Sequence, residues 1–252
     1  MAATEKLDSL LKTDSKSDAS WRTDCRNFNS GARLPEGYVN LSPAWFQQGH
    51  EVSVSALVSA YDIRQLTLNE KASDPFPEVG KDLKSAAGSE WLNCMLESNA
   101  VLSAILAVIH PALYNAGRHT FNCLRKATEI QPQNVLSRWT SVFNGVAVIC
   151  NRKTLLHRDG HSRFAWYELL TTFGNYTDCK LELPGLGVTL EYGPGTVVGF
   201  SGMLLQHAVP SFKGERVCYA YFMRGSVQKW AKASGYPWMN TNYYEKNTQH
   251  GI

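Results

Sequence analysis

The sequence lacks the features that mark membrane and secreted proteins. Its longest apolar run, residues 100–109, is far short of the roughly 18 residues that a membrane-spanning helix needs. The first six residues read Met-Ala-Ala-Thr-Glu-Lys and lead into polar sequence, without the apolar stretch of a signal peptide. We therefore expect an intracellular protein that does not enter a membrane, in the nucleus rather than the cytoplasm.

Paired cysteines and a strong net charge are also missing. The six cysteines are widely spaced and none forms a Cys-x-x-Cys pair, which excludes a small disulfide framework and favours reduced thiols in a core. The net charge is only +3 and the isoelectric point is about 8.5, whereas dedicated nucleic-acid domains usually lie above about 9. This charge permits an anionic partner without indicating one.

What is present suits one large domain. The chain has 252 residues, of which 44% are hydrophobic, enough for a substantial core, and single β-rich domains of about 200–250 residues are common. Residues 1–33 are rich in Ser, Asp, Lys and Thr, and this composition predicts a flexible N-terminal arm. We expect residues 34–252 to form a single domain with no internal repeat.

Hydrophobic spacing divides that domain into helices followed by strands. Apolar residues three and four apart predict helices over about residues 89–127, with Ser89 as N-cap and a break at Pro111. Residues 39–46 are expected to start the fold. From residue 135 the period falls to two: residues 139–150 suggest extended chain, and residues 53–60, 164–173, 187–192, 196–200 and 216–223 are strand candidates. This order predicts an α+β fold with N-terminal helices supporting a double-stranded β-helix, or jelly roll, over about residues 135–224.

Two histidines and an aspartate form a pattern with chemical meaning. His157 and Asp159 are two residues apart, so on a strand they share a face, and His207 follows 48 residues after Asp159. Two imidazoles and one carboxylate can hold iron(II) on one side and leave positions open for a cosubstrate and oxygen. Catalytic zinc and buried histidines bonded to the backbone are the alternatives.

Arg216 favours iron over zinc. It lies nine residues after His207, after a Lys-Gly-Glu turn and at the start of a candidate strand. A buried guanidinium needs an anionic partner, and the terminal carboxylate of 2-oxoglutarate suits its two-pronged geometry. A zinc hydrolase does not explain this arginine. The pattern therefore indicates an iron(II)- and 2-oxoglutarate-dependent oxygenase.

The sequence motifs around these residues resemble those of a known protein family. The stretch Leu-Leu-His-Arg-Asp ending at Asp159, the Pro-Gly-Leu-Gly and Tyr-x-Pro-Gly turns, and Arg-Val-Cys-Tyr-Ala-Tyr-Phe starting at Arg216 are similar to the TET/JBP family of dioxygenases, of the fungal and protist type. The resemblance covers about residues 135–224. It implies a double-stranded β-helix and oxidation of a methyl group on a DNA base, most often 5-methylcytosine or thymine.

The resemblance also implies roles for individual residues. His157, Asp159 and His207 would bind iron(II), and Arg216 would bind 2-oxoglutarate. Phe222 lies six residues after Arg216, so strict alternation along a strand gives both the same face, and by the resemblance its ring would stack on a flipped base. Ser162 and Arg224 would meet the base edge, and Arg224 stands where the family has a histidine. Because arginine only donates hydrogen bonds, it suits a base acceptor or a phosphate.

The case for DNA also has a physical side. An enzyme that acts on a duplex base must extrude that base and neutralise nearby phosphates. The basic residues around the first two metal ligands are Arg152, Lys153, Arg158, His161 and Arg163. We expect a monomer acting on duplex DNA with a flipped base, with 2-oxoglutarate and O2 as cosubstrates. The alternatives are N6-methyladenine or thymine as the base, a hydroxylase of a small molecule or protein, and a binding module without turnover.

Overall fold

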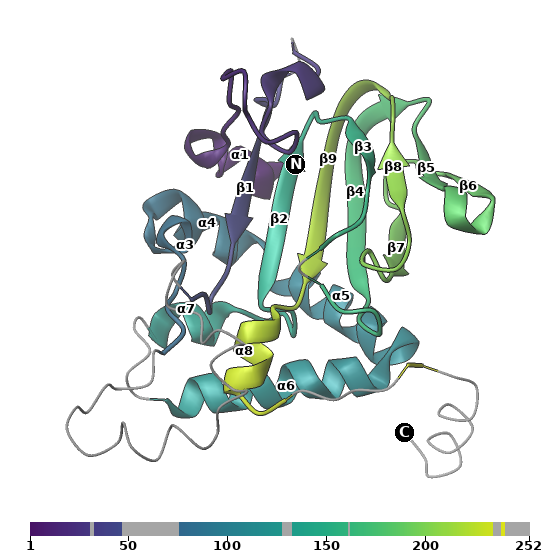
Figure 1. Ribbon diagram of the computed structural model, residues 1–252. Coiled ribbons are helices and arrows are strands. Elements are labelled where there is room, and N and C mark those ends of the chain that lie inside the picture. The colour runs from purple at the N-terminus through teal and green to yellow at the C-terminus, as the bar shows by residue number, and fades with distance from the viewer. Residues whose placement is uncertain (31–32, 47–75, 128–132, 161, 234–237, 240–252) are drawn as a thin grey trace.

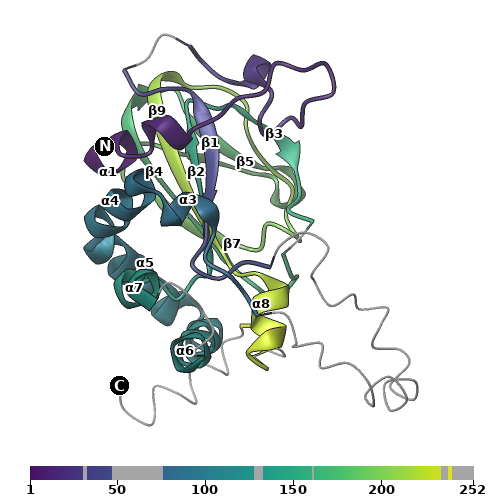
Figure 2. The same cartoon turned by 90° about the vertical axis from the view of Figure 1, so that its left-hand side faces the viewer.

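The computed structural model describes residues 1–30, 33–46, 76–127, 133–160, 162–233 and 238–239. Two antiparallel sheets lie against each other, and helices cover the outer face of the larger one (Figures 1 and 2). The predicted combination of a jelly-roll core with N-terminal supporting helices is confirmed. The predicted strand over residues 53–60 lies outside the described residues.

The larger sheet has five strands and the smaller has four. The larger sheet runs in the order β1 (Gly37–Leu41), β2 (Gly145–Cys150), β9 (Lys213–Phe222), β4 (Glu168–Thr177) and β7 (Val197–Phe200). The smaller sheet runs in the order β3 (Thr154–His157), β8 (His207–Val209), β5 (Lys180–Leu183) and β6 (Val188–Glu191). All pairings between these strands are antiparallel. All six residues of β2 are buried, because the larger sheet is covered on both faces.

The alternation of β9 separates two layers of core. Val217, Tyr219 and Tyr221 belong to the cluster that joins the large sheet to the helices. Cys218, Ala220 and Phe222 instead belong to a cluster on the opposite face, together with residues of β2. Since successive strand side chains alternate between faces, Arg216 shares the face of Phe222. The sequence-based placement of Arg216 and Phe222 on one face is therefore correct.

Six helices form the rest of the described frame: α3 (Lys81–Lys84), α4 (Ala86–Cys94), α5 (Leu96–Ile109), α6 (Pro111–Lys126), α7 (Gln133–Arg138) and α8 (Gly225–Trp230). The predicted helical region thus contains α4, α5 and α6. Pro111 is the first residue of α6, as its missing N–H permits. Ser89 is not an N-cap, because α4 begins three residues earlier and Ser85 accepts a hydrogen bond from Gly88 N.

None of the described helices has, by itself, the length and composition of a membrane span. Among the described residues, no single helix is long and apolar enough to cross a bilayer. Only α4 and α5 taken together pass that test, and they meet at an angle of 60°.

The N-terminal residues differ from the predicted flexible arm. Residues 1–30 contain α1 (Ala2–Glu5), η1 (Asp8–Leu10) and η2 (Cys25–Asn27). Leu7 is fully buried in the main core, and the Thr4 hydroxyl lies 3.1 Å from the Tyr219 hydroxyl. A few side chains of this polar segment, such as Leu7 and Thr4, attach it to the core. The prediction of a flexible arm used the average composition of the segment, which does not reveal single buried residues.

Strand boundaries differ from the predictions by a few residues. β4 begins at Glu168, four residues after the predicted start, because residues 162–167 form bends and turns rather than a strand. Residues 133–138 form α7, so the strands of the jelly roll begin at Gly145 rather than at residue 135. In both places the alternating pattern had been extended too far.

Candidate metal centre

His157, Asp159 and His207 come together at one edge of the smaller sheet. His157 ends β3, His207 begins β8, and the two are register partners. The Nε2 atoms of His157 and His207 each lie 3.5 Å from an oxygen of Asp159. One donor atom from each residue lies within 4.8 Å of the others. Residues 48 positions apart in sequence are therefore arranged as a three-ligand cluster.

The backbone fixes which nitrogen each histidine presents. Nδ1 of His157 lies 2.8 Å from Leu155 O, and Nδ1 of His207 lies 3.1 Å from Leu205 O. Since a carbonyl oxygen only accepts, both Nδ1 atoms carry a proton, and both Nε2 atoms face Asp159. Burial, reinforced by the charge of His157, lowers the pKa of His207. Both rings thus present Nε2 to the site, where this atom can bind a metal.

A second carboxyl group, that of Glu168, lies beside Asp159, and no sequence pattern indicated it. Burial alone would raise the pKa of Asp159, but the hydrogen bond with His157 and the charges of both histidines lower it. Burial and the charge of Asp159 raise the pKa of Glu168 well above its usual range. Asp159 is therefore the ionised member of the pair, and Glu168 is the neutral one that can donate a hydrogen bond.

Gly202 is what allows the two carboxyl groups to lie so close. Its carbonyl accepts a hydrogen bond from Asp159 N at 2.9 Å. A Cβ at Gly202 would collide with Glu168 Oε2 and would lie 2.7 Å from Asp159 Oδ2. A side chain at this position would therefore displace one of the two carboxyl groups.

Arg216 lies between the two sheets with its guanidinium buried. Its side chain packs over the rings of Tyr192 and Phe212, at 5.1 and 5.8 Å. Its backbone N–H donates to Asn151 Oδ1 at 2.9 Å, and its carbonyl accepts from Asn151 N at 2.7 Å. Within the described part of the chain its Nε has no hydrogen-bond partner. This buried cation fits an incoming carboxylate.

Arg152 is placed differently from the expectation that it faces DNA phosphates. It is buried, with 3% of its surface exposed, and its guanidinium lies 5.0 Å from the ring of Trp21. Burial, with the nearby charges of Arg22 and Arg216, lowers its pKa to about 10. Its Nε also lacks a partner among the described residues. Arg152 and Arg216 thus form a buried positive region that suits a dicarboxylate.

The expected base-binding residues lie on two different elements. Ser162 follows Asp159, and its N–H donates to Asp159 O at 3.2 Å. The half-buried Phe222 ends β9. The guanidinium of Arg224 lies over the ring of Trp45 at 3.2 Å and 5.7 Å from the ring of Phe222. The structure brings Phe222 and Arg224 together, and it adds Trp45, which the sequence did not single out for this site.

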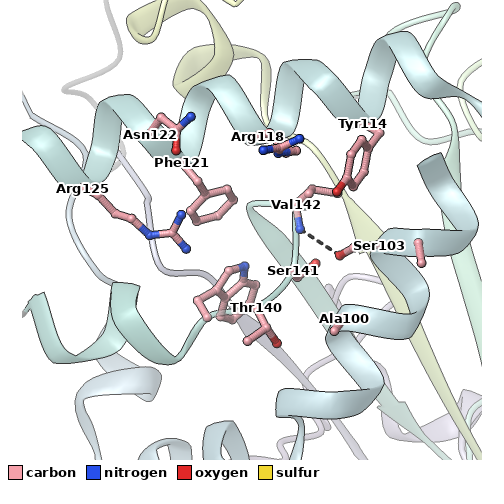
Figure 3. Close-up of a pocket in the computed structure, with 12 residues that line it drawn as sticks. Ala100, Ser103, Tyr114, Arg118, Phe121, Asn122, Arg125, Thr140, Ser141 and Val142 are labelled. Carbon is pink, nitrogen blue, oxygen red and sulfur yellow. Dashed lines mark hydrogen bonds between the residues drawn. The ribbon is translucent and has the colours of Figure 1, made fainter. Parts of the chain in front are cut away.

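A separate hollow lies in the helical layer. A cavity of about 310 Å³ lies between α5, α6 and the residues before β2, with Tyr114, Arg118 and Arg125 on its α6 side (Figure 3). Its lining contains none of the three metal-cluster residues. Chemistry at the cluster therefore does not use this cavity.

More than half of the chain matches the model of a known protein family. The family model Tet_JBP, described as the oxygenase domain of the 2OGFeDO superfamily, matches residues 79–225, which is more than half of the chain. This chain belongs to the TET/JBP family. Membership confirms the family named from the motifs, and it makes the protein an iron(II)- and 2-oxoglutarate-dependent dioxygenase. No curated protein matches this TET/JBP sequence.

Two solved structures are similar to this TET/JBP protein. NgTET1 in complex with 5mC DNA is 17% identical, with a TM-score of 0.46, and the match covers 84% of this chain and 80% of that one. A Cupin 2 conserved barrel domain protein from Salinispora arenicola is 15% identical, with a TM-score of 0.26, and the match covers 36% and 71%.

The residues of the site fit the cofactors of the TET/JBP family. The three donor atoms of His157, Asp159 and His207 match an iron(II) site of two histidines and a carboxylate. Among the described residues, the buried Nε atoms of Arg152 and Arg216 have no hydrogen-bond partner. These two cationic side chains suit the negatively charged carboxylates of 2-oxoglutarate.

Proposed function

We propose that this protein oxidises the methyl group of a modified base in DNA, with 5-methylcytosine as the foremost substrate. The observation that carries the proposal is the cluster of His157, Asp159 and His207 in a chain of the TET/JBP oxygenase family. His157, Asp159 and His207 hold the iron, and Arg216 binds a carboxylate of 2-oxoglutarate. When bound, iron(II) and 2-oxoglutarate supply the activation of O2 that the side chains cannot provide.

The protein's own contribution is orientation and exclusion of water. His157 and His207 keep their Nε2 lone pairs directed at the site because backbone carbonyls hold their Nδ1 protons. The ring of Phe200 packs against His207 with centroids 4.9 Å apart, which limits access of water from the side of the barrel core. Arg216 orients the cosubstrate from the opposite sheet with a guanidinium fork rather than a point charge.

Phe222 and Arg224 support a planar, hydrogen-bonding substrate. Phe222 lies on the inner face of β9 with Cys218 and Ala220, and it is half-buried, so part of its ring is available for stacking. Base stacking on an aromatic ring contributes about 1–3 kcal/mol. Ser162, next to Asp159, and Arg224, over Trp45, supply polar groups from two directions. A flipped base needs this combination of one stacking face and several polar edges.

Exposed cations near the cluster support a nucleic-acid partner. Arg158 and Arg163 are exposed, on the loop that carries Asp159. Arg158 Nε donates to Leu204 O at 3.0 Å, which directs this side chain toward the loop before His207. Phosphate contacts of this kind position a duplex without reading its sequence. The protein is proposed to act as a monomer in the nucleus.

Substrate-stimulated decarboxylation tests this proposal. Purified protein with iron(II), ascorbate and 2-oxoglutarate is offered matched duplexes that contain 5-methylcytosine, N6-methyladenine or only unmodified bases, and succinate is measured. We expect the largest stimulation with 5-methylcytosine. A larger response to N6-methyladenine or to thymine would reassign the base. No stimulation by any duplex would favour a small-molecule or protein substrate.

A further inference from the structure

We propose that Arg22 is a positioning residue that orients the carboxylate of Asp159 toward the metal, and that Trp21 holds Arg22 in place. The inference rests on the proposed metal-binding role of Asp159, and it assigns the N-terminal segment of residues 20–29 as one wall of the metal site. The sequence predicted a flexible arm here, so no role had been expected for either residue.

Direct contacts carry the proposal. Arg22 Nη2 donates a hydrogen bond to Asp159 Oδ1 at 3.0 Å, and the side chains of both residues are about one-third exposed. The ring of Trp21 meets the ring of His157 edge-on, with centroids 4.6 Å apart and planes at 60°. The guanidinium of Arg22 lies 4.6 Å from the centre of the Trp21 ring. Two neighbouring residues therefore contact two of the three metal ligands.

The backbone of the segment is fixed beside the strand that carries His157. Arg152 Nη1 donates to Arg22 O at 2.8 Å, and Lys153 N donates to Asn27 O at 2.8 Å. Asn29 N donates to Asn151 O at 2.7 Å. Residues 151–153 connect β2 to β3. The segment is thus bonded to the connection that leads directly into His157.

The chemistry of the ligand set gives this contact a function. A metal held by two histidines and a carboxylate needs only one oxygen of that carboxylate, and an outer partner for the other oxygen fixes its orientation. Oδ2 of Asp159 faces His207, whereas Oδ1 faces His157 and Arg22. Arg22 therefore adds a hydrogen bond from a cation to Oδ1 and helps to fix the orientation of the carboxylate. The same cation also repels a metal, so the sign of the change on its removal decides between positioning and blocking.

Metal binding to the metal-free protein tests the proposal without turnover. Binding of Mn²⁺ is measured by titration calorimetry for wild type, Arg22→Ala, Arg22→Lys, His157→Ala and the control Arg33→Ala, whose exposed guanidinium pairs with Glu5 instead. We expect Arg22→Ala to weaken Mn²⁺ binding by about 10- to 100-fold, the usual effect of losing an outer-shell partner. Arg22→Lys should recover part of the loss, and Arg33→Ala should bind as wild type.

Spectroscopy supplies a readout that a general loss of stability would not change. The visible absorption of bound Co²⁺ reports ligand geometry, and we expect its bands to shift in Arg22→Ala at saturating metal. Trp21 contacts His157, so Co²⁺ should quench tryptophan fluorescence in wild type and much less in Trp21→Phe. Unchanged bands together with unchanged affinity in Arg22→Ala would overturn the positioning role.

The remaining outcomes separate this inference from the proposed function. Tighter Mn²⁺ binding by Arg22→Ala would mean that Arg22 blocks the site, which also overturns the proposal. If His157→Ala abolishes binding while Arg22→Ala binds as wild type, only the role of Arg22 fails. If His157→Ala binds as wild type, the metal assignment fails, and the proposed function fails with it.

Discussion

The ring of Phe222 lies directly over Gly145 on the neighbouring strand. The two residues are register partners, and a Cβ at Gly145 would be 2.5 Å from Phe222 Cε2 and 2.6 Å from its Cζ. A glycine at this position of β2 therefore sets where the ring of Phe222 can lie. A substitution at Gly145 would therefore displace the ring of Phe222 while leaving Phe222 itself in place.

Substitutions at these two positions test stacking against simple core filling. If Phe222 stacks on a base, Phe222→Ala should lower turnover of methylated DNA about tenfold or more, since stacking contributes about 1–3 kcal/mol, while uncoupled decarboxylation of 2-oxoglutarate persists. Gly145→Ala should lower DNA turnover in the same selective way. Parallel loss of both activities with a lower melting temperature would show instead that the ring only fills the core.

Arg216 should govern the affinity for 2-oxoglutarate. Arg216→Lys keeps the charge but loses the two-pronged geometry, and hydrogen bonds to charged groups contribute about 1.5–3 kcal/mol. We expect the Michaelis constant for 2-oxoglutarate to rise by about 10- to 100-fold, measured by succinate formation. Arg118→Lys, an exposed change on α6, is the control. An unchanged constant in Arg216→Lys would remove this residue from the cosubstrate site.

His110 should make the fold less stable in mild acid. Its Nδ1 accepts from Leu113 N, which caps α6, and its Nε2 donates to Ala165 O, so the buried ring must stay neutral. Burial lowers its pKa in the folded protein. Above about pH 6.5 both states are neutral. Below it the unfolded chain gains a proton that the folded chain does not, so the free energy of unfolding falls by up to about 1.4 kcal/mol per pH unit.

Denaturant unfolding between pH 7.5 and 5 measures this effect. His110→Asn keeps a good capping residue but cannot titrate, so the difference in unfolding free energy between wild type and variant should be constant above pH 6.5 and should shrink below it. An equally steep acid loss in both proteins would assign the dependence to other groups.

Leu7 tests whether the N-terminal residues are part of the folded core. The side chain is fully buried in the cluster that joins the sheet to the helices. Leu7→Ala should therefore reduce the free energy of unfolding by about 2–5 kcal/mol, as for other buried leucines. Lys16→Ala, at an exposed position of the same region, should change it by less than about 0.5 kcal/mol. Equal stability of the two variants would restore the flexible-arm interpretation.

The sequence predicted the parts of this site that depend on local spacing. His157 and Asp159 are close because they are two residues apart, and Arg216 and Phe222 share a face because strand side chains alternate. Pro111 marked the break between α5 and α6 because it lacks an N–H. Recognition of the TET/JBP family rested on motifs around these same residues.

Long-range packing supplied what the sequence could not. Glu168 has an ordinary position at the start of a strand, and only the close approach at Gly202 brings it to Asp159. Arg152 belongs to a basic stretch of the sequence, but its side chain is buried and packs against Trp21 instead of facing solvent. Trp21 and Arg22 lie in a polar segment whose contacts with His157 and Asp159 span more than 130 residues. No periodicity encodes such contacts.

Mass spectrometry of nucleosides tests the central claim most directly. Wild type and His207→Ala are each incubated with iron(II), 2-oxoglutarate and a duplex containing 5-methylcytosine, and the digested DNA is analysed. We predict that wild type converts 5-methylcytosine to 5-hydroxymethylcytosine and that His207→Ala, which lacks one metal ligand, does not. The account would be contradicted if 5-methylcytosine remained unchanged while wild type consumed 2-oxoglutarate, or if His207→Ala formed the product at the wild-type rate.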